Sequence, residues 1–459
     1  MPKRNRSASA GASLNDLSLA QLREMMAAHQ VERIYAKVLS ANDNSKNQPY
    51  LGGDFGVLNI LPSDTPVASR TTGARKKPIF KAALRFSWLG RDGKLYSAPE
   101  AKLILYPQYP EVRFSGYLIG ADREHRPSET MGTTRVPDRV LVLGVREDRQ
   151  LIGFAAGPES RLARELKTLR DAERVGVFVR VPLSEGDTAA ADRALLLAEL
   201  CRISQLGWID SKRLDRSGTV LPCLAPNCGG YTLEAELGIT PNGFSEPDFH
   251  GWEVKQHGVT RFERPSNSMI TLMTPEPSDG FYVEKGVIAF VEKYGYPDVA
   301  GREGRLNFGG SFRRGERLPR TGLRLELLGY DAERATIADP MGGIALLDDD
   351  DVEAATWRFA DLIGHWSRKH ALAAFVPSIT RDKPHRQYQY SDHIRLGTGT
   401  TFDRFLSAVW SRAVVYDPGI KVEGYPDNLR SKRRSQFRLK STELPALYES
   451  FELVSACAK

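Results

Sequence analysis

Asp248, Glu253 and Lys255 have the residue types and spacing for metal-assisted chemistry. Side chains alternate between the two faces of a strand, so Glu253 and Lys255 point the same way on the short apolar strand expected around residues 252–254. Asp248 can reach that face from the turn that a proline and a glycine predict just before the strand. The spacing therefore predicts two carboxylates and one ammonium group in one small volume.

This set suits hydrolysis of a phosphodiester. Asp248, Glu253 and the backbone carbonyl of Val254 offer the hard oxygen ligands that Mg²⁺ prefers, and Mn²⁺ can substitute. A divalent cation there polarises the scissile phosphate and activates a water, while Lys255 orients that water and stabilises the developing charge. Glu234, on a helix expected to precede Asp248, can add a further carboxylate. A surface strand carrying a salt bridge is the simpler alternative for so short a pattern.

Several basic residues downstream are candidate DNA contacts. His257 follows Lys255 on the same face if the strand continues, where it can touch a phosphate or donate a proton; an ordinary histidine beside the site is the alternative. Arg261 and Arg264 can contact phosphates or base edges, or form salt bridges with Glu263 and its neighbours.

The positive charge of the chain is unevenly spread. The net charge is +7, and residues 65–91 and 428–440 contain several basic residues and no acidic ones. Such stretches favour a polyanionic partner, because each phosphate contact releases counterions, although a solvated surface gives the same pattern. Arg434 and Arg438 in the second stretch, and Lys369 on a basic helix at 364–370, are predicted to contact DNA.

The elements that must position these residues predict two domains. Residues 1–15 are expected to be a disordered tail, and residues 16–185 a mainly-β domain after a capped helix at 16–30. Its strands are expected at 34–39, 57–61, 82–86, 102–106, 140–143, 151–154 and 175–181, with a helix at 159–172. Arg113 in this domain is a candidate DNA contact, with a salt bridge to Glu111 or Glu100 as the alternative.

Residues 186–459 show an α/β pattern with a strong helix at 189–206 and another from 232 to 237. The acidic run 348–351 is expected to be a short loop or the start of a helix at 352–355. Cys201, Cys223, Cys228 and Cys457 are expected to be free thiols in a reducing cytosol, because no zinc-finger spacing is present. No stretch reaches the ~20 apolar residues of a membrane span or forms a signal peptide, so a cytoplasmic location is expected.

The C-terminal part resembles the MvaI/BcnI restriction endonuclease family. The resemblance is carried by segments 229–239, 247–248, 251–255, 272–277, 416–421 and 434–438, and it covers roughly residues 195–459. That family is related to the mismatch-repair nickase MutH and has the PD-(D/E)xK nuclease fold, a central mixed sheet flanked by helices. The resemblance implies a monomeric, Mg²⁺-dependent nuclease that binds double-stranded DNA in a cleft. The gap between Asp248 and Glu253 is slightly shorter than in MutH-like enzymes.

The N-terminal part resembles the effector-binding domain of EcoRII, a mainly-β DNA-binding pseudobarrel. Segments 35–44, 52–53 and 61–62 carry this resemblance. It implies that the N-terminal domain binds DNA, including a second, effector copy, whereas a structural or protein-contact role is the alternative. Taken together, the sequence predicts a sequence-specific, type II restriction-like endonuclease in host defence. A MutH-like strand-nicking repair nuclease and a non-catalytic DNA-binding regulator are the alternatives.

Overall fold

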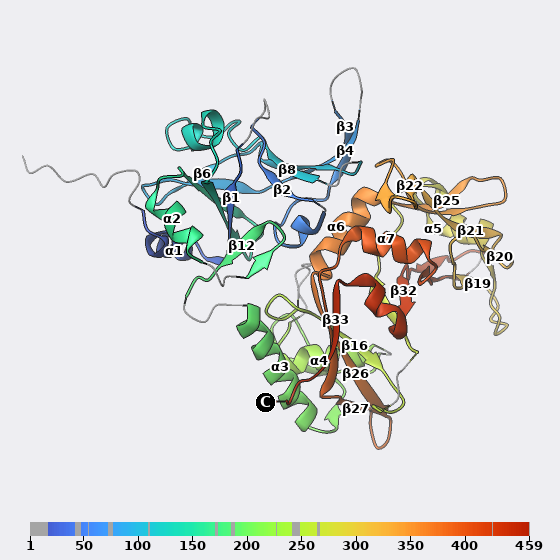
Figure 1. Cartoon of the computed structure of the whole chain (residues 1–459). Helices are drawn as coiled ribbons and strands as arrows, with labels where there is room; N and C mark the ends of the chain where they lie inside the picture. The colour runs from blue at the N-terminus through green and yellow to red at the C-terminus, as the bar shows by residue number, and fades with distance from the viewer. Residues whose placement is uncertain are drawn as a thin grey trace, which may run out of the picture.

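The computed structural model describes residues 17–41, 47–53, 55–71, 77–108, 111–169, 173–184, 189–225, 227–240, 248–263, 267–424 and 426–458. The expected tail at 1–15 and most of the expected interdomain break at 184–188 lie outside these residues. Figure 1 shows an N-terminal domain (17–184) and a C-terminal region made of two lobes. The first lobe comprises residues 189–263, 371–400 and 448–458, and the second lobe comprises residues 267–370 and 401–447.

Two sheets and their shared apolar interior form the N-terminal domain, as the mainly-β expectation stated. The seven-stranded sheet has the order β11 (Arg174–Val175), β12 (Phe178–Val181), β1 (Val31–Leu39), β9 (Arg139–Arg146), β10 (Leu151–Ala156), β5 (Phe86–Leu89) and β6 (Leu95–Ser97). The five-stranded sheet has the order β2 (Tyr50–Gly52), β8 (Glu111–Ser115), β7 (Lys102–Tyr106), β4 (Pro78–Ala83) and β3 (Val67–Arg70). Phe80, Trp88 and Phe114 are buried in the interior of this domain.

Two helices pack on the seven-stranded sheet through a separate apolar cluster. The expected N-terminal helix is α1 (Leu19–Ala28), which begins with a capping box between Ser18 and Gln21. The helix expected at 159–172 is α2 (Arg161–Lys167), capped by Ser160. Leu22 and Leu162 of these helices pack in one cluster with strand residues such as Val142. A short π-helix, η2 (Ser128–Thr133), completes the domain.

Three expected strands of this domain are wrong in detail. Residues 57–61 are not a strand, because the apolar side chains of η1 (Phe55–Asn59), a 3₁₀ helix, pack into the core instead of pairing. The stretch 82–86 is divided between β4 and β5, which belong to different sheets. The stretch 175–181 is the hairpin β11–β12, which turns at Gly176 with φ +58°.

The first lobe is a mixed sheet flanked by helices, as expected. Its sheet has the order β13 (Ile209–Asp210), β27 (Gln387–Tyr390), β26 (Leu372–Arg381), β28 (His393–Thr398) and β33 (Ser450–Ser455), with β16 (Glu253–Gly258) parallel to β26. Helices α3 (Ala189–Gln205) and α4 (Cys228–Glu236) pack on the sheet around Leu200, Leu233 and Val254. A small hairpin, β14 (Lys212–Leu214) and β15 (Val220–Pro222), lies beside α4.

The second lobe contains three larger sheets and one short hairpin. One sheet has the order β17 (Met269–Met273), β32 (Phe437–Lys440) and β29 (Val414–Tyr416). A second has the order β18 (Tyr296–Pro297), β19 (Arg305–Gly309), β30 (Gly419–Glu423) and β31 (Arg430–Lys432). The third has the order β20 (Arg317–Leu318), β21 (Leu323–Leu328), β24 (Gly343–Leu347) and β25 (Glu353–Arg358). The hairpin is β22 (Tyr330–Asp331) and β23 (Thr336–Ile337). The helices are α5 (Phe281–Tyr294), α6 (Phe359–Lys369), α7 (Phe402–Trp410) and the 3₁₀ helix η3 (Ser441–Leu447).

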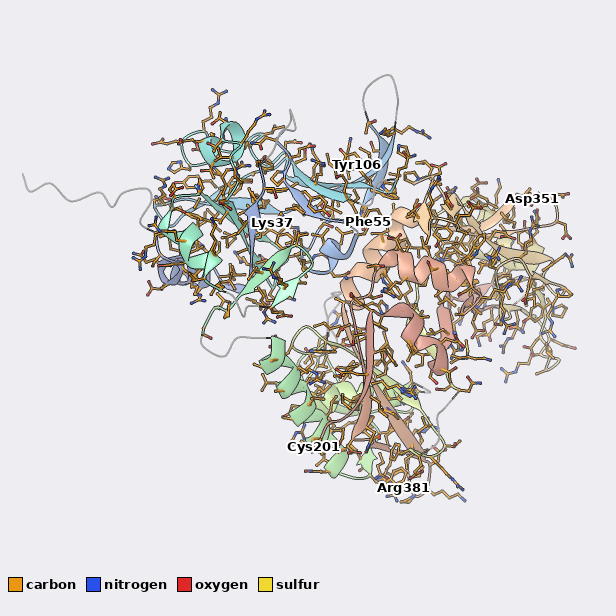
Figure 2. All side chains as sticks on the ribbon, in the orientation of Figure 1. Lys37, Phe55, Tyr106, Cys201, Asp351 and Arg381 are labelled. Atoms are coloured by element: carbon orange, nitrogen blue, oxygen red, sulfur yellow. A yellow bond between two sulfur atoms is a disulfide. The ribbon has the colours of Figure 1, made fainter. Side chains whose placement is uncertain are left out.

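The acidic run 348–351 is a loop, and the helix expected at 352–355 is wrong. The run forms the turn of the hairpin β24–β25, at the far end of the second lobe, where Figure 2 labels Asp351. Asp349 pairs with Arg317 and Asp351 pairs with Arg324, so arginines of the same sheet neutralise the charges that the sequence assigned to a helix start.

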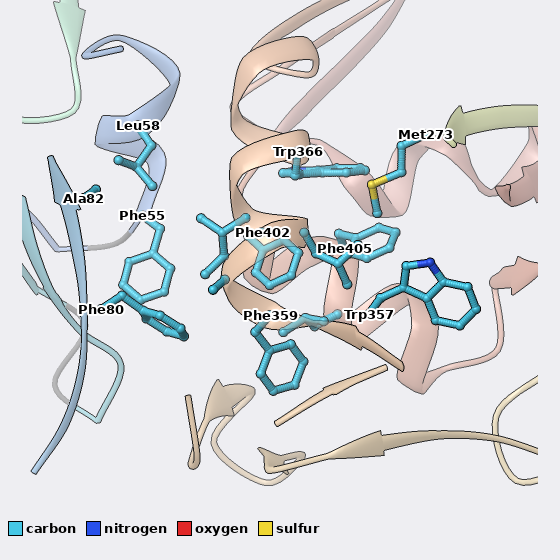
Figure 3. Packing of buried hydrophobic residues seen from close by; sticks show 14 of the residues in the cluster. Phe55, Leu58, Phe80, Ala82, Met273, Trp357, Phe359, Trp366, Phe402 and Phe405 are labelled. Atoms are coloured by element: carbon cyan, nitrogen blue, oxygen red, sulfur yellow. The ribbon is translucent and has the colours of Figure 1, made fainter. Parts of the chain in front are cut away.

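One continuous apolar core joins the N-terminal domain to the second lobe. Figure 3 shows Phe55, Leu58 and Phe80 of the N-terminal domain beside the helix α6, which itself contributes Phe359 and Trp366 to the core. The N-terminal domain and the second lobe therefore share a buried interior. A hydrogen bond of 3.1 Å from the side chain of Asn59 to the carbonyl of Thr400 also joins the N-terminal domain to the first lobe.

The expectation of free thiols is wrong. Cys201 on α3 (labelled in Figure 2) is bonded to Cys457, and Cys223 is bonded to Cys228 at the start of α4. The first pair is far apart in sequence and meets only because the chain returns along β33 to the end of α3, which no local pattern reveals. No helix in the described ranges is long and apolar enough to cross a membrane.

Candidate active site

A tight turn folds Asp248 back against the strand that follows it. Phe249 and Trp252 exchange two backbone hydrogen bonds of 2.9 and 2.8 Å, and His250 and Gly251 between them have φ +45° and +82°. Two successive positive φ values are the signature of a type I′ turn, which reverses the chain in two residues. The Asp248 carboxylate then accepts a hydrogen bond from the backbone N–H of Val254, at 2.9 Å. The short gap between Asp248 and Glu253 is thus the length of one hairpin turn.

Glu253 and Lys255 lie on the same face of β16, as expected. The Lys255 ammonium donates to Glu253 Oε1 at 2.9 Å, and Glu253 is only 4% exposed. This pair is therefore not the exposed salt bridge of a surface strand, which was the simpler alternative. The second oxygen of Glu253, Oε2, is buried without a hydrogen-bond partner among the residues that the structure describes.

Burial and like charge act together on Asp248. Burial and, second, the neighbouring charge of Glu253 raise the pKa of its carboxyl group to about 7, although the Val254 N–H and Lys255 act in the opposite direction. The charge of Glu234 adds a smaller upward contribution. The predicted residues Asp248, Glu253, Lys255 and Glu234 are therefore close enough to influence each other electrostatically.

The helix α4 brings Glu234 to this site. It packs against β16, where a Cβ on Gly229 would lie 2.8 Å from the Gln256 side-chain oxygen, so glycine lets α4 approach this side chain as it is placed here. Tyr390 also donates to the Gly229 carbonyl at 2.7 Å. Glu234 lines a small pocket of about 90 Å³ with residues that include Arg213 and Tyr231.

The arrangement fits a divalent cation in its chemistry. Two carboxylates in close proximity, one with a buried oxygen lacking a partner, repel each other until a proton or a cation compensates them. The carbonyl of Val254 lies on the same short strand as a further hard oxygen. No group of three or more His, Cys, Asp or Glu side chains is arranged as metal ligands within the described residues, so the two carboxylates are the core of the candidate site.

His257 lies on the same strand as Glu253 and Lys255, because β16 continues to Gly258. It is buried, and its Nδ1 has no hydrogen-bond partner among the described residues. Burial, with a smaller contribution from the charge of Arg395, lowers the pKa of His257 to about 4. His257 is therefore neutral near pH 7 and can act there as a hydrogen-bond donor or acceptor, not as a cation.

The structure adds Arg395, which the sequence reasoning missed. It lies on β28, in register with Phe375 of β26, and Phe375 is in register with Lys255. Directly paired residues share a face of the sheet, so Arg395 and Lys255 lie on the same face. Only the strand pairing reveals this neighbour, because Arg395 is remote from the site in sequence.

The other predicted DNA contacts divide into exposed and internally paired residues. Arg261, in the turn after β16, and Arg434, before β32, are exposed. Arg438 instead pairs with Asp417, and Arg113 makes two 3.0 Å hydrogen bonds to Glu111, the salt bridge named as its alternative. Arg264 and the side chain of Lys369 lie outside the described parts.

The Asp248 turn opens onto a large cleft of about 2220 Å³. Its walls come from the N-terminal domain, including Arg33 and Arg149, and from the first lobe, including Asp248 and Gly251. Arginines and acidic residues both line it. The N-terminal domain thus forms one wall of the approach to Asp248.

Comparisons with known proteins give one family. The sequence model of the MvaI/BcnI restriction endonuclease family matches residues 197–448, more than half of the chain. Among solved structures, the chain is similar to the restriction endonuclease MvaI bound to its cognate DNA, with 18% identity, a TM-score of 0.42, and coverage of 56% of this chain and 96% of that one. The DNA-free MvaI structure gives 18% identity, a TM-score of 0.31, and coverage of 57% and 97%. No curated protein matches the chain.

Proposed function

Because the chain belongs to the MvaI/BcnI restriction endonuclease family and is a DNA endonuclease, we propose that it is a type II restriction-like enzyme of host defence. Its substrate is double-stranded DNA, cut at a specific sequence with Mg²⁺. Its active site is formed by Asp248, Glu253 and Lys255, with Glu234 in support. Residues 186–459 form the nuclease domain, with the PD-(D/E)xK core in the first lobe.

One observation carries the assignment of the site. The type I′ turn places Asp248 next to the buried Glu253–Lys255 pair, so that two carboxylates and one ammonium group share one small volume at the edge of the large cleft. A stabilising salt bridge with Lys255 would need only the carboxylate of Glu253. The carboxylate of Asp248, whose pKa is raised to about 7 by burial and by Glu253, destabilises the fold when it ionises, and a catalytic role explains its presence.

The residues of the site have separate proposed roles in cation binding and in catalysis. Asp248, Glu253 and the carbonyl of Val254 would hold the cation, and Mg²⁺ suits these hard oxygens, with Mn²⁺ able to replace it. When bound, such a cation supplies Lewis-acid polarisation of the scissile phosphate. Lys255 orients the attacking water and balances the charge that develops on the phosphate. Its salt bridge to Glu253 keeps the ammonium group at this position.

The N-terminal domain, residues 16–185, is proposed to be a pseudobarrel that contacts DNA, including a second effector copy. Support comes from its mainly-β architecture and from its position as a wall of the cleft that reaches Asp248. Arg261 and Arg434 are the exposed candidates for backbone contacts in the C-terminal region. His257 is proposed to contact the phosphate as a neutral group.

The test is cleavage of supercoiled plasmid DNA carrying the recognition site, which is first located by digesting a sequenced genome and mapping the ends. Asp248→Asn and Lys255→Ala are expected to lose at least about 10²-fold in cleavage rate while still binding DNA in a mobility-shift assay. Asp382→Asn, at an exposed aspartate in the loop after β26, serves as the control and retains wild-type cleavage. Wild-type rates in either site variant would place the active site elsewhere.

The same assay separates double-strand cutting from nicking. Linear product at the end of the reaction supports the restriction-like function. Persistent open-circular DNA would instead show a MutH-like enzyme that leaves one strand intact.

A further inference from the structure

Tyr448 places a buried hydroxyl group near the site that no described residue satisfies. The side chain is 3% exposed, and its Oη has no hydrogen-bond partner among the described residues. Buried hydroxyl groups are normally hydrogen-bonded, and each exception needs an explanation. Tyr448 follows η3 and belongs to the segment that leads into β33, so nothing in its sequence neighbourhood connects it with Glu253.

The strand register places the Tyr448 ring on the same face of the sheet as Glu253. Glu253 on β16 is in register with Ala373 on β26, and Ala373 is in register with Gly397 on β28. These three residues form a row across the sheet on one face, and neighbouring strands lie about 5 Å apart. A Cβ on Gly397 would lie 2.7–2.8 Å from ring atoms Cγ, Cδ1 and Cδ2 of Tyr448, so the ring occupies the space that any larger residue would fill.

Aromatic neighbours hold the Tyr448 ring over this row. Phe451 stacks on it with ring centroids 5.9 Å apart, and Phe375 meets it edge-on at 6.0 Å. The near end of the ring lies over Gly397, and the hydroxyl extends from the far end. Ala373 offers only a methyl group between Gly397 and Glu253, which leaves the route to the carboxylate open.

Electrostatics agree with this placement. Burial raises the pKa of the Tyr448 hydroxyl above its ordinary value, and the charge of Glu253 is the second cause. Glu253 Oε2 is itself buried and without a partner, while Oε1 accepts from Lys255. Among the described residues, a buried donor without an acceptor and a buried acceptor without a donor therefore lie on the same face of the sheet.

We infer that Tyr448 is a positioning residue of the active site, whose Oη donates a hydrogen bond to a water that in turn donates to Glu253 Oε2. Each carboxylate oxygen can accept from two directions, so this bond leaves Glu253 free to bind a cation. With Lys255 on one oxygen and Tyr448 on the other, the carboxylate plane is fixed. This inference rests on the proposed role of Glu253 as a metal ligand.

The experiment compares Tyr448→Phe with wild type, because this change removes only the hydroxyl group. Calorimetric titration of the DNA-free, chelator-treated protein with Mn²⁺ is expected to show roughly tenfold weaker binding, as for other groups that orient a metal ligand. The Mg²⁺ concentration for half-maximal plasmid cleavage should rise in parallel. The unfolding temperature should not fall, because the ring and its aromatic contacts remain.

Two further variants distinguish an error in the role of Tyr448 from an error in the proposed active site. Tyr294→Phe removes a buried hydroxyl that donates to Asp348 at 3.0 Å in the second lobe, and it should leave Mn²⁺ binding unchanged. Glu253→Gln should lose both Mn²⁺ binding and cleavage. Wild-type Mn²⁺ affinity in Tyr448→Phe, with loss in Glu253→Gln, would overturn the role of Tyr448 alone. Unchanged binding and cleavage in Glu253→Gln would overturn the proposed site and this inference together.

Discussion

At Asp248 the requirements of folding and of function oppose each other. The carboxyl group is buried beside Glu253, so its pKa is raised to about 7, and ionisation near neutral pH costs native stability when no cation is present. The N–H of Val254 and the ammonium of Lys255 recover part of that cost. Such tension is expected where a site is built to bind a cation and not to stabilise the fold.

This tension predicts a pH-dependent gain in stability for Asp248→Asn. The native state keeps the Asp248 proton up to about pH 7, whereas the unfolded chain loses it near pH 4, so stability falls as pH rises through this window. In EDTA, the variant should exceed wild type in free energy of unfolding by about 4 kcal/mol at pH 8 and by little at pH 4. Denaturant unfolding at both pH values measures this. A variant less stable than wild type at pH 8 would contradict the account.

At His257 the change of native stability with pH has the opposite sign to that at Asp248. Its lowered pKa, about 4, means that the native state takes up its proton at a lower pH than the unfolded chain, so this histidine costs stability as pH falls from about 6.5 to 4. His257→Gln should therefore lose less stability than wild type between pH 7 and pH 4.5, measured by denaturant unfolding. His393, an exposed histidine paired with Asp392, provides the matched control in His393→Gln.

At the scale of elements, the turn 249–252 decides whether the site exists. The chain reverses within two residues, and this reversal lets Asp248 accept from Val254 and lie beside Glu253. The positive φ values of His250 and Gly251 are the cost of such a short connection. The strand β16 and the helix α4 then fix the remaining groups.

Gly251→Ala tests the turn. Alanine at φ +82° is strained by roughly 1–2 kcal/mol, and relief of that strain would move Asp248 away from Glu253. Cleavage should fall at least tenfold and the unfolding temperature should drop by several degrees. Gly258→Ala, at the end of the same strand where a Cβ meets nothing within 4 Å, should change neither by much. Equal effects of the two changes would show that the turn has no special role.

At the scale of the whole molecule, the N-terminal domain and the second lobe are joined by a buried interior. The 3₁₀ helix η1 packs its apolar side chains toward α6, and the same cluster continues through both parts (Figure 3). Because residues 371–400 of the first lobe lie between the two segments of the second lobe in sequence, this junction also fixes the wall of the cleft that reaches Asp248.

This junction predicts cooperative unfolding. Calorimetry of the wild type should show one transition that includes both parts. Leu58→Asp buries a charge at the junction, costs about 3 kcal/mol or more, and should divide the trace into two transitions. Val67→Asp, at a residue 65% exposed on β3, is the control and should keep one transition. Two transitions already present in wild type would show that the domains unfold independently.

The sequence by itself determined the local features. Glu253 and Lys255 share a face because strands alternate, and α1 follows from its cap while α3 follows from its Ala- and Leu-rich composition. The family match supports the resemblance read from residues 229–255. Only the tertiary structure decided the rest. Folding buried the Glu253–Lys255 ion pair, strand pairing placed Arg395 on the same sheet face, and the return of β33 joined Cys457 to Cys201. These contacts join residues far apart in the chain, and no local pattern encodes them.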